Sequence, residues 1–478
     1  MASAVIKVKI NTGTVLHTMR GGIGASWHAM SNDIPLENEK YDYPVRFQNP
    51  RGSAYGGNPP ISETEAWGEI YGHAAWLGLN FIRVELSQRM YESERGVFDW
   101  ENEEMLALYR ILDWCESHDA DVFLQQMWGH VELNAFPGVH PLLSAPRSLD
   151  DFASGIRELI SHLLGEKHYT CIKYFSITNE PPGGTWGYWW SHGQGSGTIT
   201  PALRKVREYL DEAGINLPLS GPDWTSLPPL NPEQIDFDPF IGAYDIHSYD
   251  GIDSKGEGII RDWAEWAHSR QKPFFLSELG NMKTGWGGDN AGPKSFEASL
   301  SNASDIISCL NMGTDGVNRW SFVNRGDLDG QWQLIQTWDR EKKIYLKNIV
   351  PESPAYYGFG IMSRYIGKYA SIVGSAAMPG SLQIKTAAVI NRTGEITAFF
   401  LNDTSLPERV SVKITGDAAM RSLYLYQVSK RLVSEAGFRL EPTETQQEVS
   451  GDFSLTLPEM SISVLTNYYL AADDPGII

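Results

Sequence analysis

Short apolar runs alternate with longer segments of helical periodicity from about residue 20 to residue 322, and this alternation constrains the fold most strongly. Strands that alternate with helices pair in parallel, and eight such strands predict an α/β protein with a closed (β/α)8 barrel, the TIM barrel. The eight runs are Gly21–His28, Asn80–Leu86, Asp121–Met127, Ile172–Thr178, Leu217–Ser220, Ala243–His247, Pro273–Ser277 and Gly316–Phe322.

An open, doubly wound sheet is the alternative architecture for such a pattern. It would place a glycine-rich phosphate-binding turn after the first strand. Here the motif GGIG, Gly21–Gly24, lies at the start of the first candidate strand, and no acidic residue follows at the right distance. The missing motif therefore favours the barrel.

The pattern changes beyond about Pro354, where short alternating runs are separated by turn residues. This pattern is typical of an all-β module and predicts a C-terminal β-sandwich. Residues 1–18 also alternate, without belonging to a barrel unit. We therefore predict three parts: residues 1–18 as N-terminal strands that join the sandwich, residues 19–354 as the catalytic barrel, and residues 355–478 as the β-sandwich domain.

Charge and cysteine usage narrow the classes of partner. Asp and Glu number 59 against 39 Lys and Arg, which gives a net charge of −20. We see no basic cluster, so we expect no nucleic-acid or membrane partner. The three cysteines, Cys115, Cys171 and Cys309, lie far apart in apolar segments, so we expect buried free thiols rather than disulfides or a zinc site.

The N-terminal segment MASAVIKVKINTG lacks a hydrophobic signal core, and no apolar run reaches membrane-spanning length. We expect a cytoplasmic protein from this feature, or a secreted one if the chain has been trimmed.

Polar side chains follow two of the apolar runs. Asn179 and Glu180 come directly after Ile172–Thr178, and Glu278 ends the similar run in KPFFLSELG. Because the carboxyl ends of barrel strands carry catalytic groups, the two glutamates can face each other across the barrel mouth. Paired carboxylates about 5–5.5 Å apart suit a retaining glycosidase, and about 6.5–9.5 Å suits an inverting one. The alternative for either motif alone is a strand followed by a solvated turn.

Further residues can support this pair. Arg83 lies within the apolar run FIRVEL, and a buried arginine needs an anionic partner. Glu278 is the candidate partner, and a structural ion pair with Glu85 is the alternative. His247 and Tyr249 are two positions apart, so they share a face on an extended backbone. Both can point into the site, with Tyr249 donating to the nucleophile and His247 donating near the acid. A structural role for the two residues is the alternative.

Aromatic and histidine side chains are also candidates for substrate binding. The chain has 16 tryptophans, and aromatic faces suit the C–H surfaces of sugar rings. Trp186 lies in a loop-like segment, and Trp320 on the last strand can form the floor of a sugar site, although alone it would be assigned to the core. His28 and His130 follow the first and third strands. They lack paired metal-ligand spacing, so we expect sugar hydrogen bonding, with no metal and no cofactor.

Together these motifs resemble clan A of the glycoside hydrolases, which are retaining enzymes with glutamates at the ends of strands 4 and 7. The resemblance covers about residues 20–350. It implies that Glu180 is the acid/base, Glu278 the nucleophile, and Asn179 a hydrogen-bond partner of the sugar 2-hydroxyl. The matching residues are Asn179-Glu180-Pro181, Glu278 in SELG, Arg83, the triplet His247-Ser248-Tyr249, and Trp320.

Within the clan, the HSY triplet, Arg83 and ELG resemble family 5, and a β-sandwich that includes an N-terminal strand is similar to families 30 and 39. The resemblance implies a retaining β-glycosidase that acts on gluco-, galacto- or xylo-configured oligosaccharides. An endo-acting β-glycanase or a transglycosidase on the same scaffold is the alternative.

A noncatalytic carbohydrate-binding barrel is the rival hypothesis from another class. Such a protein would tolerate the loss of one glutamate, yet both are present. A third hypothesis makes the sandwich the sugar-binding part, and it would need an exposed row of aromatic side chains.

Overall fold

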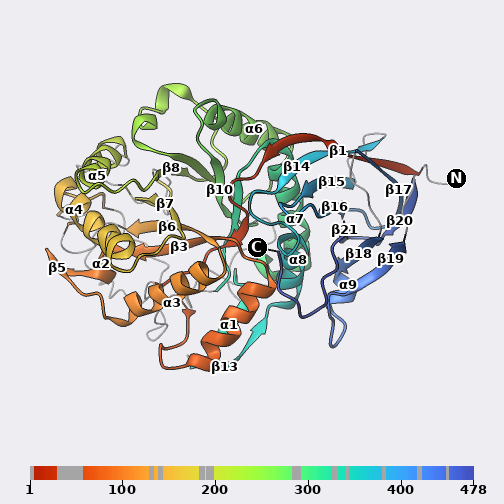
Figure 1. Cartoon of the computed structure of the whole chain (residues 1–478), viewed down its shortest axis with the longest axis horizontal. Coiled ribbons are helices and arrows are strands. Elements are labelled where there is room, and N and C mark those ends of the chain that lie inside the picture. The colour runs from red at the N-terminus through yellow and green to blue at the C-terminus, as the bar shows by residue number, and fades with distance from the viewer. Residues whose placement is uncertain are drawn as a thin grey trace.

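A computed structural model gives the fold and describes residues 5–29, 57–128, 134–137, 144–181, 189, 199–282, 292–323, 332–339, 344–378, 384–416, 422–447 and 452–477. Its centre is an eight-stranded parallel sheet in the order β2-β11-β10-β9-β8-β7-β6-β3 (Figure 1). The strands are β2 (Ile23–Ala25), β3 (Phe81–Ser87), β6 (Asp121–Trp128), β7 (Ile172–Ser176), β8 (Leu219–Trp224), β9 (Ala243–Ser248), β10 (Phe274–Leu279) and β11 (Gly316–Arg319).

Backbone hydrogen bonds at the ends of β2 and β3 close this sheet into a barrel. The N–H of Trp27 donates to the carbonyl of Arg83 at 2.9 Å, and the N–H of Asn80 donates to Ile23 at 3.3 Å. A Cβ on Gly24 would lie 1.5 Å from the carbonyl oxygen of Phe81, so only glycine allows the two strands to approach this closely. The prediction of a TIM barrel is confirmed, and part of the GGIG motif serves its closure.

Helices surround the barrel (Figure 1). Several begin at a side chain that caps the first turn, because Asn102, Ser148, Asp253 and Ser295 each accept a hydrogen bond from a backbone N–H three residues later. The helices are α1 (Thr64–Trp76), α2 (Gln88–Tyr91), α3 (Glu103–Ser117), α4 (Leu149–Ile160), α5 (Thr200–Glu212), α6 (Ser254–Ser269), α7 (Phe296–Met312) and α8 (Ser353–Ser363).

Two short antiparallel pairs extend from the barrel: β4 (Glu92–Glu94) with β5 (Val97–Phe98), and β12 (Ile335–Asp339) with β13 (Ile344–Pro351). None of the described helices combines the length and the apolar character needed to cross a bilayer. The three cysteines are free and buried, as expected.

A second, nine-stranded sheet has the order β19-β18-β21-β16-β15-β14-β1-β17-β20 and lies at the right of Figure 1. The N-terminal strand β1 (Ile6–Thr18) pairs antiparallel with β14 and parallel with β17. The other strands are β14 (Ser371–Met378), β15 (Ile384–Ile390), β16 (Ile396–Asn402), β17 (Glu408–Thr415), β18 (Ser422–Ser429), β19 (Pro442–Gln447), β20 (Phe453–Leu457) and β21 (Ser461–Thr466), with the short helix α9 (Lys430–Val433) after β18.

This sheet has a core on each face. Leu423 of β18 and Leu455 of β20 come from opposite ends of the sheet yet lie in one hydrophobic cluster, so the sheet curls over and its two ends face each other as in a sandwich. On the other face, Phe399 and Tyr426 belong to the core of the barrel, together with Phe359 of α8. The two parts of the molecule therefore share a continuous apolar core.

The described residues give no support to a sugar-binding face on this sheet. The exposed aromatic side chains near it, Tyr369, Tyr468 and Tyr469, lie before β14 and after β21. They do not form a row along a strand, which the third hypothesis required.

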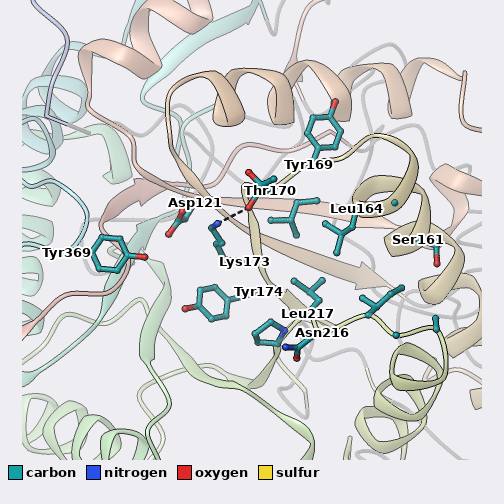
Figure 2. Close-up of a pocket in the computed structure, with 16 residues that line it drawn as sticks. Asp121, Ser161, Leu164, Tyr169, Thr170, Lys173, Tyr174, Asn216, Leu217 and Tyr369 are labelled. Atoms are coloured by element: carbon teal, nitrogen blue, oxygen red, sulfur yellow. Dashed lines mark hydrogen bonds between the residues drawn. The ribbon is translucent and has the colours of Figure 1, made fainter.

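An open groove of about 730 Å³ lies at the amino end of the barrel strands (Figure 2). Its lining includes Asp121 and Tyr174. Asp121 pairs with Lys368 at 3.1 Å, and Lys173 donates to the carbonyl of Thr170 at 2.8 Å. This groove lies at the end of the barrel opposite to the candidate carboxylates.

Candidate active site

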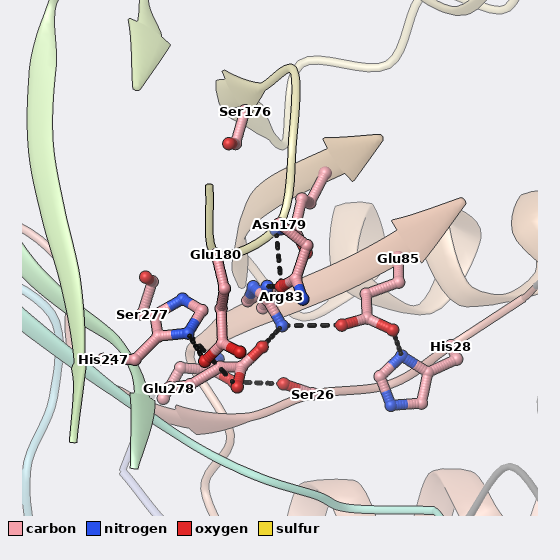
Figure 3. A network of polar contacts seen from close by, with 12 residues as sticks. Ser26, His28, Arg83, Glu85, Ser176, Asn179, Glu180, His247, Ser277 and Glu278 are labelled. Atoms are coloured by element: carbon pink, nitrogen blue, oxygen red, sulfur yellow. Dashed lines mark hydrogen bonds and ion pairs between the residues drawn. The ribbon is translucent and has the colours of Figure 1, made fainter. Parts of the chain in front are cut away.

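The candidate carboxylates lie close together at the carboxyl ends of β7 and β10 (Figure 3). One carboxylate oxygen of Glu180, one of Glu278 and a ring nitrogen of His247 all lie within 4.8 Å of one another. Glu180 and Glu278 are 8% and 4% exposed. The parallel strands of the barrel thus bring together residues that are 98 positions apart in the sequence.

Glu278 is surrounded by donors. It forms an ion pair with Arg83, accepts a hydrogen bond from the hydroxyl of Tyr249, and lies 3.3 Å from Nδ1 of His247. Nη1 of Arg83 also contacts Glu85 at 2.7 Å. Arg83 therefore binds both the predicted partner and the alternative one, because its guanidinium lies between them.

Glu180 has an unusual backbone conformation with a φ of 48°. Its backbone N–H donates to Oδ2 of Asp223 at 3.0 Å, and its Oε1 lies 2.8 Å from Nδ1 of His247. The carboxyl group is thus held at the end of β7 by contacts from β8 and β9.

Asn179 lies beside Arg83. Its Oδ1 accepts hydrogen bonds from Nη2 of Arg83 at 2.8 Å and from Nε2 of Gln125 at 3.1 Å. The amide oxygen is therefore engaged by the protein, and the NH2 group is the part of Asn179 that can contact a substrate oxygen.

His28 and Trp320 lie next to the ion pairs of Arg83. Nδ1 of His28 is 3.1 Å from Oε2 of Glu85, and the rings of His28 and Trp320 are 4.8 Å apart between centroids. The guanidinium of Arg83 lies 6.0 Å from the ring of Trp320. His28 and Glu85 are both fully buried, so His28 belongs to the network of Arg83, and its predicted contact with a sugar stays a prediction.

Two predicted residues, His130 and Trp186, lie outside the described residues. The same is true of segments that follow several barrel strands, among them 129–133, 182–188, 283–291 and 324–331. The described part of the site consists of side chains on and just after the barrel strands.

Burial and neighbouring charges set the protonation of the site. Burial raises the pKa of Glu278 to about 7, although Arg83 and His247 lower it. Burial lowers the pKa of His247, but Glu278 and Asp223 outweigh this and raise it well above the ordinary value. The neighbouring carboxylates therefore favour the imidazolium form of His247. Burial and the charge of Glu278 raise the pKa of Tyr249, so its hydroxyl keeps the proton that it donates.

Both ring nitrogens of His247 lie within 2.9 Å of a carboxylate oxygen, on Glu180 and on Asp223. An imidazolium donates from both nitrogens and has no lone pair for a metal. This geometry favours a proton-holding group over a metal ligand, and the expected lack of a metal stays a prediction.

Asp223 and Gln125 also belong to this site, although no sequence motif indicated them. Gln125 Nε2 donates to Oδ2 of Asp223 at 3.0 Å, and Asp245 lies next to Asp223. Gln125 could have been found by the signal that singled out Arg83, a polar side chain within an apolar strand. Asp223 follows Gly221-Pro222. The predicted strand stops at Ser220, before these two residues, so it did not include Asp223.

A comparison with models of protein families identifies the family of this chain. The model of the cellulase family, glycosyl hydrolase family 5, matches residues 48–322, more than half of the chain. The chain belongs to glycosyl hydrolase family 5. This family 5 protein is therefore a glycoside hydrolase, and the resemblance to clan A is confirmed. No curated protein sequence matches the chain.

Several solved structures are similar to this family 5 enzyme. They include the family 30 subfamily 8 xylanase Xyn30A from Clostridium acetobutylicum, with 13% identity, a TM-score of 0.62, and coverage of 96% of this chain and 99% of that chain. An endo-β-1,6-glucanase has 12% identity, a TM-score of 0.63, and coverage of 98% and 95%. The family 51 α-L-arabinofuranosidase from Thermotoga petrophila RKU-1 has 13% identity, a TM-score of 0.59, and coverage of 96% and 99%.

These identities are low, so the likeness concerns the fold. The coverage includes both the barrel and the nine-stranded sheet. The two-part architecture of this family 5 enzyme is therefore similar to that of structures in families 30 and 51.

Proposed function

We propose that this family 5 enzyme is a retaining β-glycosidase, with Glu278 as the nucleophile and Glu180 as the acid/base. The observation that carries this proposal is the pair of buried carboxylates, whose nearest oxygens lie within 4.8 Å. This spacing is compatible with direct attack on the sugar, whereas an inverting enzyme needs room for a water molecule between its carboxylates.

The unequal partners of the two glutamates support their separate roles. Glu278 contacts Arg83, Tyr249 and His247, and these donors favour the ionised form that a nucleophile needs. Glu180 contacts His247 through Oε1, so Oε2 can hold the proton for the leaving oxygen. Different environments thus assign different roles to two chemically equal groups.

The proposed reaction has two steps. Glu180 protonates the glycosidic oxygen as the bond to the anomeric carbon breaks, and Glu278 bonds to that carbon from the opposite face. Glu180, now ionised, takes a proton from water, the water oxygen attacks the anomeric carbon, and Glu278 leaves. Two inversions give a product with the configuration of the substrate.

Substrate contacts follow from the base of the site. The NH2 group of Asn179 can donate to the sugar 2-hydroxyl, and Trp320 offers a ring face beside Arg83. We propose a β-linked gluco-, galacto- or xylo-configured oligosaccharide as the substrate. His130 and Trp186 remain proposed binding residues. Among the similar structures, a xylanase and an endo-β-1,6-glucanase support the search among such sugars.

The roles can be tested with aryl β- and α-glycosides of these sugars and the variants Glu180→Ala and Glu278→Ala. Removal of a nucleophile or acid/base should lower kcat/KM by about 100-fold or more for unactivated substrates. Azide should restore turnover of Glu278→Ala with an α-glycosyl azide as product, and of Glu180→Ala with a β-glycosyl azide. Glu297→Ala, on the exposed surface of α7, is the matched control and should keep wild-type activity.

Full activity of either active-site alanine variant would contradict the role of that glutamate. If the wild type hydrolyses β-linked polysaccharide but none of the aryl glycosides, the same azide experiment is made on the polymer, and the enzyme is then an endo-acting glycanase.

A further inference from the structure

Asp223, at the end of β8, interacts with the acid/base residue Glu180 directly and also through His247. Its Oδ2 accepts a hydrogen bond from the backbone N–H of Glu180 at 3.0 Å. Its Oδ1 lies 2.9 Å from Nε2 of His247, and the other nitrogen of that ring lies 2.8 Å from Oε1 of Glu180. One buried carboxylate thus engages both the backbone and, through His247, the side chain of Glu180.

The backbone contact has a conformational role. Glu180 has a φ of 48° and Asp223 a φ of 60°, in the left-handed region where a residue other than glycine is disfavoured by about 1 kcal/mol. The hydrogen bond between the two residues compensates for this cost, and Gln125 donates to the same oxygen of Asp223 at 3.0 Å. The contact therefore fixes the direction in which Glu180 leaves the end of β7.

The side-chain contact has an electrostatic role. The ring of His247 on β9 is fully buried and faces Asp223 from β8, Glu180 from the end of β7 and Glu278 from β10. Arg83 from β3 pairs with Glu278 rather than with the imidazole. A buried imidazolium needs a counter-charge. Asp223 and Asp245 both lie within 4.8 Å of a ring nitrogen of His247, and Asp223 is the one in hydrogen-bond contact with it, at 2.9 Å from Nε2.

We propose that Asp223 is the positioning residue of the acid/base: it fixes the backbone of Glu180 and keeps His247 as a cation between the two catalytic carboxylates. This inference rests on the roles proposed for Glu180 and Glu278. It adds to the site a carboxylate that the sequence motifs did not indicate. Asp223 acts through Glu180 and His247 and does not contact the substrate.

The neighbouring Asp245 provides a matched comparison. It is fully buried on β9, and its oxygens accept hydrogen bonds from Ser220 at 2.7 Å and Ser277 at 2.9 Å. Burial and the charge of Asp223 raise the pKa of Asp245 well above its ordinary value. Burial and this neighbour therefore favour the neutral form of Asp245. Asp245→Asn changes a carboxyl group that contacts Ser220 and Ser277. Asp223→Asn changes, in nearly the same place, the carboxyl group that contacts Glu180 and His247.

Kinetics with two classes of leaving group separate positioning of the acid/base from a general structural effect. A general acid contributes about 100- to 10,000-fold where the leaving group needs a proton. We expect Asp223→Asn to lower kcat/KM by about 10- to 100-fold on a disaccharide or phenyl glycoside, and by less than about 3-fold on a dinitrophenyl glycoside. Asp245→Asn should change both values by less than about 3-fold. An equal loss on both classes of substrate would overturn the proposal.

NMR of histidine-labelled enzyme without substrate tests the electrostatic part independently of activity. The His247 signal, identified by its absence in His247→Asn, should be that of an imidazolium at pH 7 in the wild type and in Asp245→Asn. In Asp223→Asn it should become neutral at lower pH. A neutral His247 in the wild type at pH 7 would overturn the proposal even if Asp223→Asn failed to fold. The two experiments can also disagree. If the azide experiment fails but His247 is an imidazolium, the roles proposed for the two glutamates are wrong, while the pairing of Asp223 with His247 stands.

Discussion

The carboxylate of Glu278 is subject to opposing effects on its protonation. Burial raises its pKa to about 7, and the positive charges of Arg83 and His247 act in the other direction. The hydroxyl of Tyr249 donates to the same carboxylate, and a hydrogen bond to a carboxylate favours its ionised form. These three donors make Glu278 available as an anion near neutral pH.

The pH dependence of activity follows from this balance. Below the pKa of Glu278 the nucleophile is protonated, so kcat/KM should fall as the pH decreases through about 7. A hydrogen bond to a charged group contributes about 1.5–3 kcal/mol, and about 1.4 kcal/mol corresponds to one pH unit. Tyr249→Phe should therefore move the acid limb of the kcat/KM profile up by about one to two units.

Profiles of kcat/KM against pH for the wild type, Tyr249→Phe and Tyr174→Phe test this prediction. Tyr174 lines the groove at the opposite end of the barrel, so its variant should leave the limb in place. A limb that does not move in Tyr249→Phe, or that moves to lower pH, would be incompatible with a hydrogen bond that stabilises the anion.

Three polar residues of the site could be predicted from the sequence, because Glu180, Glu278 and His247 each lie at the end of an apolar run. Asp223 could not, because Gly221-Pro222 resembles the end of a strand, yet β8 continues to Trp224. A sequence motif gives the position of a residue along the chain. It does not show which side chains contact that residue in the fold.

At the scale of elements, the seam between β2 and β3 shows what a pattern can predict and what it cannot. The alternation predicted both strands, and β3 spans Phe81–Ser87, close to the predicted run. In the sequence, Gly24 is notable only as part of the GGIG motif. Its structural reason is the 1.5 Å approach that a Cβ would make to Phe81, which depends on a strand far away in the sequence.

The strand β1 is an element whose role depends on two distant partners. It pairs with β14 and β17, and Val8 is 1% exposed within the second core, whereas Val15 on the same strand is 53% exposed. Val8→Asp should lower the free energy of unfolding by about 3–5 kcal/mol, because it buries an unpaired charge. Val15→Asp should change it by less than about 0.5 kcal/mol.

Chemical denaturation followed by circular dichroism and by glycosidase activity measures this difference. Since the sheet and the barrel share a core, both signals should be lost together in Val8→Asp at lower denaturant concentration. Equal stability of the two variants, or loss of the sheet with full retention of activity, would contradict the shared core.

For the whole molecule, the sequence predicted a barrel followed by a β-rich part with an N-terminal strand. It did not predict that the sheet would bury both of its faces. Phe399 and Phe400 are neighbours on β16, yet they lie in different cores, one shared with the barrel and one inside the sheet. Alternation of apolar residues on both faces does not show which partner covers each face, because that depends on how α7 and α8 pack.

The central claim is that Glu278 attacks the sugar. An aryl 2-deoxy-2-fluoro-β-glycoside of the sugar that the enzyme hydrolyses tests this claim most directly, because the fluorine slows both steps and a good leaving group lets the intermediate accumulate. Mass spectrometry of the digested protein should find one sugar on the peptide that contains Glu278, and none in Glu278→Ala. A label on the peptide that contains Glu180, or turnover with inversion and no label, would contradict the claim.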